Sequence, residues 1–204
     1  MQSASTNSEQ NLVTRQIILQ AAYEEIYARG FQAASIAKIL STTDVTKGAL
    51  YHYFPTKLDL GYAVVDELLA EQIQARWIEP LLIADDPISA LKEIIIAAGQ
   101  EISEEDIQCG CPLNNLAQEM SPVDEGFRLR VEAVYKMWRV GTEEAFKQGQ
   151  RHGLVKQNVD PKNIAIMLVA SLEGCIGMAK SAQSKNILYQ CGQSIIDYLD
   201  GLRG

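Results

Sequence analysis

Cysteine and proline are scarce in this chain of 204 residues, which holds four cysteines and six prolines. Four cysteines are too few for the disulfide framework of a small secreted scaffold. We therefore expect reduced thiols. The longest apolar run, residues 164–170, is far shorter than the ~20 residues of a membrane-spanning helix. The first eleven residues lack the basic start and apolar stretch of a secretory signal. The sequence therefore predicts a soluble, cytoplasmic protein with no membrane partner.

Residues that interrupt helices are few, whereas residues that favour them are plentiful. Alanine, leucine, isoleucine, glutamate and glutamine are frequent, and this composition favours long helices over many short strands. Hydrophobic residues make up 47% of the chain, which is enough to bury a sizeable core. We therefore expect an all-α protein.

Apolar spacing and turn residues predict four helices in the first 80 residues. In the first helix Val13 and Ile17 belong to the apolar stripe, and Gly30 follows as a stop signal. A polar turn separates the second helix from the third, and Pro80 ends the fourth. Two short helices joined by a tight turn indicate a helix-turn-helix. The predicted helices are residues 12–29, 35–40, 46–54 and 56–77.

The rest of the chain carries the same helical periodicity and predicts a helical bundle. An acidic turn at residues 104–106 and the turn Cys109-Gly-Cys111 interrupt it, and Ser121-Pro122 begins the longest helix. The predicted helices are residues 87–103, 113–120, 121–149, 160–179 and 187–199.

The net charge of −8 suggests at first that the protein repels nucleic acid. The charge is unevenly distributed, because residues 1–60 hold five basic and five acidic residues while residues 61–204 hold 13 and 21. Residues 35–57 contain three lysines and only Asp44 as an acid. Lysines, small hydroxyls and a helix N-terminus are groups that bind phosphates, and a short exposed helix can approach base edges. The acidity therefore belongs to the bundle and does not exclude DNA binding.

Residues 45–57, with the sequence VTKGALYHYFPTK, carry a specific resemblance together with Gly30-Phe31, Ser35-Ile36 and Ile39. This pattern resembles the helix-turn-helix of TetR/AcrR-type transcriptional regulators. The resemblance covers about the first 65 residues, and the remainder matches that family in length and all-helical plan. It implies a DNA-binding domain at residues 1–60 and a ligand-sensing and dimerisation domain at residues 61–204.

The resemblance assigns DNA-binding roles to eight residues. Ser35 and Lys57 would clamp backbone phosphates, and Thr46 would cap the recognition helix. The three residues after Thr46 would face base edges. The predicted DNA-binding residues are Ser35, Thr46, Lys47, Gly48, Ala49, Tyr51, His52 and Lys57. Leu50 and Phe54 are expected in the core. Tyr53 either packs in the core or contacts the DNA.

Two positions depart from the family pattern. The position that usually holds a capping threonine is Ala34, so the first motif helix lacks a cap unless Ser35 takes that place. The turn position that is often glycine is Asp44, for which we expect a left-handed backbone.

The resemblance also implies a homodimer on a palindromic operator, joined through the last two helices, with a small-molecule effector bound in the bundle. Small residues, including Gly174, Gly177, Ala179 and Ser181, mark the dimer helix beside Ile176 and Met178. The predicted ligand-binding residues are Phe127, Tyr135, Trp138, Met167, Cys175 and Asn115. The expected function is a ligand-responsive repressor.

Two other functions stay open at this point. Cys109 and Cys111 lie on a turn and form either a thiol-based redox or electrophile sensor or an ordinary packed turn. A helical enzyme or an interaction module is disfavoured because the chain shows no nucleophile and base pair, phosphate loop or metal-ligand spacing. We expect no enzyme activity, metal or cofactor.

Overall fold

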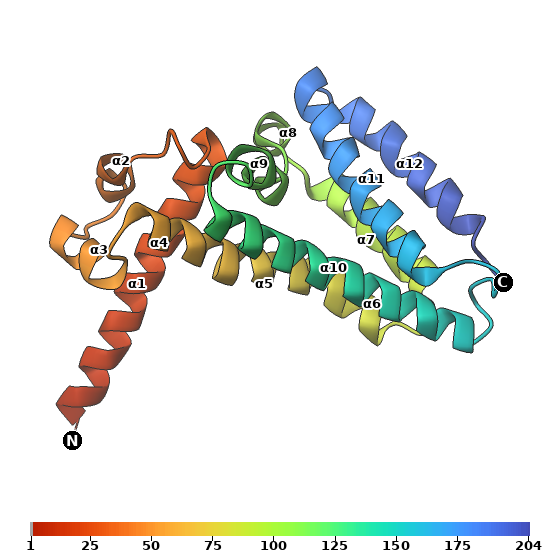
Figure 1. Cartoon of the computed structure of the whole chain (residues 1–204), viewed down its shortest axis with the longest axis horizontal. Coiled ribbons are helices and arrows are strands. Elements are labelled where there is room, and N and C mark those ends of the chain that lie inside the picture. The colour runs from red at the N-terminus through yellow and green to blue at the C-terminus, as the bar shows by residue number, and fades with distance from the viewer. Residues whose placement is uncertain (1) are drawn as a thin grey trace. The chain divides into compact units, whose positions relative to one another are not determined.

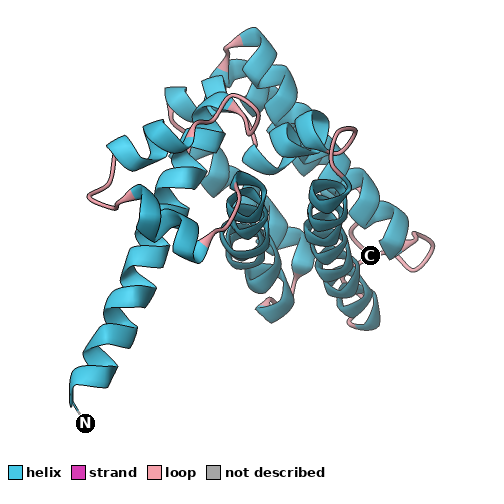
Figure 2. Ribbon diagram, turned by 60° about the vertical axis from the view of Figure 1, so that its left-hand side comes forward, coloured by secondary structure: helices cyan, strands magenta, loops and turns pink. Residues whose placement is uncertain are grey.

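A computed structural model describes residues 2–204, with side chains from residue 11 onward. The described residues form helices joined by short loops, with no strand among them, which confirms the all-α fold class (Figure 2). The elements are α1 (Gln2–Arg29), α2 (Ile36–Ser41), α3 (Lys47–Tyr53), α4 (Lys57–Ala63), η1 (Val64–Leu69), α5 (Ala70–Ile73), η2 (Gln74–Ile78), α6 (Glu79–Ile83), α7 (Pro87–Glu101), α8 (Glu104–Cys109), α9 (Pro112–Met120), α10 (Glu125–Arg151), α11 (Pro161–Ala182) and α12 (Lys185–Asp200).

The chain packs into two compact units. The first unit contains the residues up to Ala70 together with Asn115–Val131, and the second contains Glu71–Asn114 and Glu132–Gly204. The first unit thus contains residues 61–70, which lie beyond the predicted division, and a segment from the middle of the chain. The predicted division at residue 60 stays a prediction about function.

Polar side chains fix where the two motif helices begin. Ser35 caps α2, since its Oγ accepts a hydrogen bond from the Lys38 amide at 3.1 Å. Thr46 caps α3 in the same way, because its Oγ1 accepts from the Ala49 amide at 3.2 Å. Ser35 therefore takes the capping place that Ala34 leaves open, and Ala34 is buried.

Helix α1 differs from its predicted form at its start and on its exposed face. It begins at Gln2, ten residues before the predicted start at residue 12, since no helix-breaking residue precedes that position. Ile18 and Ile26 are buried, as their spacing indicates, but Val13 and Ile17 are exposed. The prediction that these two residues lie on a packed stripe was wrong, because the short helices α2 to α4 cover only one side of α1.

An aromatic cluster forms the centre of the first unit. The Phe127 ring is fully buried and meets Phe31 edge-on at a centroid distance of 4.6 Å and Tyr62 at 5.1 Å. Gly61 lies against this cluster, where an added Cβ would come within 2.4 Å of Phe31 and 2.7 Å of Phe127. The packing therefore requires a residue without a side chain at position 61.

The helix that leaves the motif does not end at Pro80. Helical backbone continues from α4 through the π-helical segments η1 and η2 to Ile83 at the end of α6. Pro80 stands in the first turn of α6, where the missing N–H costs little, so the predicted break was wrong.

The core of the second unit is built mainly on α7, α11 and α12. Helices α11 and α12 run side by side and are joined by a tight turn in which Gln183 is left-handed (Figure 1). The largest buried groups of this core include Leu81, Ile88, Leu91, Phe146, Leu168 and Leu199.

Two predicted boundaries in the middle of the chain were wrong. The acidic residues 104–106 form the first turn of α8, where Ser103 and Asp106 make a capping box and the acids favour the helix N-terminus. The longest helix, α10, starts at Glu125 instead of Ser121, because the Asp124 carboxylate accepts the Phe127 amide at 2.8 Å. Local capping groups decide both boundaries.

Helix α11 is, among the described residues, the one helix long and apolar enough to cross a membrane by length and composition. The sequence analysis did not single out this helix, because its longest uninterrupted apolar run covers only residues 164–170. Core helices of soluble proteins pass the same test, and Ile164, Leu168 and Ala179 on α11 are buried within the unit. We interpret α11 as a core helix.

Replacing Gly61 with alanine is expected to destabilise the protein. The added methyl group would overlap the aromatic cluster, so the free energy of unfolding should fall by about 1–3 kcal/mol. Gly48→Ala is the matched control, since position 48 is open and alanine favours the helix by about 0.5–1 kcal/mol. Urea denaturation of both variants measures the effect, and equal stability of Gly61→Ala and the wild type would contradict it.

Candidate nucleic-acid interface

Helix α3 presents a polar, lysine-bearing face to solvent. Lys47, Gly48, Tyr51 and His52 are exposed, and Ala49 is half-buried. The Lys47 ammonium lies 5.9 Å from the centroid of the Tyr51 ring. A Cβ on Gly48 would meet no atom closer than 4.0 Å, so this side of α3 is open to close approach. Five of the eight predicted DNA-binding residues thus lie together on one short helix.

The opposite side of α3 holds the helix in place. Leu50 and Phe54 are buried, as expected for core residues. Tyr53 is half-buried, and its hydroxyl donates a hydrogen bond to Asn11 Oδ1 on α1 at 3.2 Å. The Arg15 guanidinium lies 5.1 Å from the Phe54 ring centroid. These contacts fix which face of α3 remains exposed.

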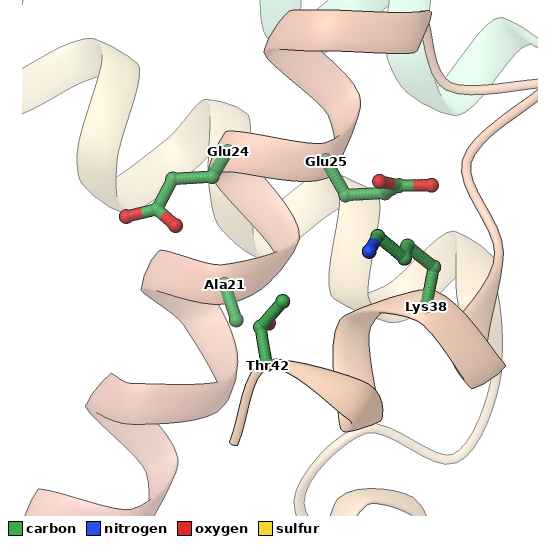
Figure 3. Close-up of a pocket in the computed structure, with 5 residues that line it drawn as sticks. All are labelled: Ala21, Glu24, Glu25, Lys38 and Thr42. Atoms are coloured by element: carbon green, nitrogen blue, oxygen red, sulfur yellow. The ribbon is translucent and has the colours of Figure 1, made fainter.

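A buried carboxylate supports the start of α2. Glu25 on α1 is 9% exposed, and its Oε1 accepts the Ser35 amide at 3.4 Å. A small pocket of about 130 Å³ separates α1 from α2 at this point, and Figure 3 shows the side chains that line it. The lining residues are Ala21, Glu24, Glu25, Lys38 and Thr42. Ser35 keeps its hydroxyl proton available for an outside acceptor such as a phosphate.

Lys57 is tied to the protein more closely than the sequence indicates. Its Nζ donates to the Gln32 carbonyl at 3.1 Å and lies 4.7 Å from the centroid of the Phe31 ring. Burial lowers the pKa of the Lys57 ammonium, and the nearby Glu119 and Glu25 oppose this shift. An ammonium has three donors, so two remain for a phosphate.

Glu119 is a site residue that the sequence does not reveal. Its carboxylate accepts two hydrogen bonds at 2.8 Å, one from the Phe31 amide and one from the Gln32 amide. These amides follow Gly30, whose φ of 81° turns the chain out of α1 toward α2. Glu119 lies 88 positions beyond Phe31, so no local pattern signals the contact.

The turn of the motif is less strained than its sequence suggests. Gln183 is the only residue other than glycine with a positive φ in the described part of the chain, so Asp44 is not left-handed. The expectation of a left-handed backbone at Asp44 was wrong. Thr42 closes α2 with hydrogen bonds to Ile39 and Leu40, and Thr43 Oγ1 accepts the Val45 amide, so the turn forms without that conformation.

The predicted ligand-binding residues do not form one group. Met167 and Cys175 line a pocket of about 300 Å³ between α11 and α12. The Trp138 ring lies tilted against Trp77 at a centroid distance of 5.2 Å, and Tyr135 faces the carboxylate of Glu173. Phe127 and Asn115 belong to the first unit, where the Phe127 ring is enclosed by the aromatic cluster. The role of all six in ligand binding stays a prediction.

The two turn cysteines are poorly suited to thiolate chemistry. Burial raises the pKa of the Cys111 thiol well above its usual range, and the nearby Glu173 raises it further. Burial and the nearby Glu105 raise the pKa of Cys109. Low-pKa thiolates are the reactive form, so the structure does not favour a sensor at these positions. The described residues contain no group of three or more His, Cys, Asp or Glu side chains placed to hold a metal ion.

Comparison with known proteins identifies both parts of the chain. Residues 18–64 match the model of bacterial regulatory proteins of the tetR family, and residues 87–194 match the C-terminal domain of LmrA/YxaF-like transcriptional regulators. An uncharacterized HTH-type transcriptional regulator in the lacX 3′ region of Lactococcus lactis is 31% identical over 176 residues, covering 86% of this chain and 87% of that protein. The transcriptional regulator AcuR of Cereibacter sphaeroides is 27% identical over 171 residues, covering 82% and 77%.

A solved structure shares the fold over nearly the full length. A TetR transcriptional regulator from Chloroflexus aurantiacus superposes with a TM-score of 0.83 at 22% identity, covering 96% of this chain and 98% of that one. Members of this family are DNA-binding regulators and not enzymes. Both parts of the chain match models of this family, and the exposed face of α3 fits a DNA-binding role. The chain belongs to the TetR family of bacterial transcriptional regulators.

Proposed function

We propose that this regulator is a cytoplasmic, ligand-responsive repressor that binds a palindromic operator as a homodimer. The exposed, lysine-bearing face of α3 carries the proposal, since a short helix with small residues and hydroxyls on one face fits a major groove. Residues 1–60 act as the DNA-binding domain and residues 61–204 as the ligand-sensing and dimerisation domain. Repression is the common mode of regulation in this family.

The N-terminal half of α3 reads the DNA. Lys47 and the open backbone at Gly48 approach base edges, together with Ala49. Tyr51 and His52 reach phosphate or sugar, and the N-terminus of α3 favours a phosphate at Thr46. Ser35 and Lys57 contact the flanking phosphates with the donors that the fold leaves available.

Helices α11 and α12 form the surface for the second copy. Ile166 and Met178 on α11 are 45% and 59% exposed, and Tyr189 and Tyr198 on α12 are 50% and 40% exposed. Added Cβ atoms at Gly174 and Gly177 would meet nothing within 4 Å, so the face between the apolar side chains is open. Ala179 is buried and belongs to the core instead. A two-fold dimer would cover this face and double the number of base pairs read.

The effector acts through helices that continue from one unit into the other. Residues 57–83 are helical without a break, and their first half packs against α1 in the first unit. A ligand that prefers one packing of the second unit would shift the tilt of this helix and so the spacing of two α3 helices. Met167 and Cys175, in their shared pocket, and Tyr135 and Trp138 remain the proposed ligand contacts in that unit.

Removing the side chains of Lys47 or Tyr51 is expected to weaken operator binding. The operator is first selected from a random pool of duplexes, and gel-shift titration then measures Lys47→Ala and Tyr51→Ala. Each should bind about tenfold more weakly, with a smaller salt slope for Lys47→Ala, because a phosphate or base contact is lost. Lys162→Ala, an exposed lysine of the second unit, should bind as the wild type does. Unchanged affinity in both α3 variants would contradict the assignment.

Introducing a charge on the α11 face is expected to break the dimer. Met178→Asp would place an unpaired carboxylate in the covered apolar face, so the protein should sediment with the mass of one chain. Ile83→Asp is the matched control, because Ile83 is 85% exposed on α6 and lies outside α11 and α12. Analytical ultracentrifugation distinguishes the two, and a dimeric Met178→Asp protein would place the interface elsewhere.

A further inference from the structure

A buried carboxylate in the second unit has an oxygen without a partner. Glu173 lies in the middle of α11 and is only 8% exposed. Its Oε1 accepts the Cys111 thiol at a distance of 3.4 Å, whereas its Oε2 has no hydrogen-bond partner among the described residues. Tyr135 on α10 faces the same carboxylate. Two polar groups from different parts of the unit thus meet at the Glu173 carboxylate, whose Oε2 still lacks a donor within the described chain.

This arrangement destabilises the folded protein. Burying an unsatisfied acceptor costs free energy, and burying an unpaired negative charge costs more. Burial raises the pKa of the Glu173 carboxyl to about 7, and the hydrogen bonds from Cys111 and Tyr135 offset only part of that rise. None of the ion pairs in the described part of the chain involves Glu173. A methionine or leucine would suit this otherwise apolar helix better.

The surroundings of Glu173 indicate what is missing. Cys111 and Tyr135 are each partly exposed, whereas Oε2 of Glu173 is buried behind them, so the cluster lies at the edge of the core of its unit. A donor that also brings a positive charge would satisfy Oε2 and neutralise the carboxylate in one step, and charge-assisted hydrogen bonds are the strong ones. A neutral donor would satisfy the oxygen but leave the charge buried.

We propose that Glu173, held between Cys111 and Tyr135, is the recognition group for an effector that carries a protonated amine. The carboxylate accepts the N–H of the ligand through Oε2, and Tyr135 provides an aromatic ring and a hydroxyl beside the bound ammonium. This inference rests on the proposed ligand-responsive function and names the chemical class that the second unit binds.

The test compares three small probes of the same shape. Phenethylammonium carries the protonated amine, 2-phenylethanol a neutral donor, and phenylacetate an anion. Titration calorimetry on the full chain at millimolar probe should show binding of phenethylammonium alone. Glu173→Gln should weaken that binding by about tenfold or more, the effect of losing one charge-assisted hydrogen bond. Glu71→Gln, an exposed carboxylate of the same unit, should leave it unchanged.

A second variant separates ligand recognition from a structural role. Glu173→Met removes the unpaired acceptor and keeps the volume, so its melting temperature should equal or exceed that of the wild type while phenethylammonium binding is lost. A clear drop in melting temperature would show that Glu173 supports the fold and would overturn the proposal.

Other outcomes are equally decisive. Absence of phenethylammonium binding, equal binding of all three probes, or full binding to Glu173→Gln would each overturn the proposal. Operator binding without probe should be the same for Glu173→Gln and the wild type. A wild-type protein that binds operator DNA but no probe would refute this inference alone, whereas one that binds no DNA would refute the proposed function.

Discussion

The burial of the Phe127 ring against Phe31 and Tyr62 is the contact on which the DNA-binding unit depends. Helices α2, α3 and α4 have only six or seven residues each, which is too short for helices to be stable without tertiary packing. The core that holds them is completed by residues 115–131, which arrive from the middle of the chain. The close approach at Gly61 follows from the same packing, since any side chain there would displace the rings.

The same middle segment also positions the motif through polar contacts. Glu119 binds the two amides that follow α1, and Lys57 binds the carbonyl of Gln32 in the same turn. Both contacts hold the chain just before Ser35, which caps α2. Helix α9 starts in the second unit, next to Cys111 and its contact with Glu173, and ends in the first unit at Met120, directly after Glu119. Like the helix of residues 57–83 and helix α10, it therefore continues from one unit into the other.

The distribution of charge explains how an acidic protein can read DNA. Several acids of the second unit are paired within it, as in the ion pairs Arg139–Glu132, Arg151–Glu144 and Lys92–Asp200. Exposed pairs of this kind add little stability, but they reduce the free negative charge. Lys47 forms no ion pair among the described residues, and its ammonium lies 5.9 Å from the centroid of the Tyr51 ring, so its charge remains available to a phosphate or base.

Local patterns in the sequence were enough to predict the all-α class, the helix-turn-helix, the cap at Thr46 and the burial of Leu50 and Phe54. Helical spacing and capping residues act over a few positions, so they can be read locally. Other features became visible only in the folded chain. Ser35 caps α2, α1 exposes Val13 and Ile17, helical backbone continues past Pro80, and Glu119 and Phe127 complete the DNA-binding unit. It also brought Cys111, Tyr135 and Glu173 together. These features depend on contacts between residues far apart in the chain, such as Phe31 and Glu119 at a separation of 88 positions, and such contacts leave no periodic pattern in a single sequence.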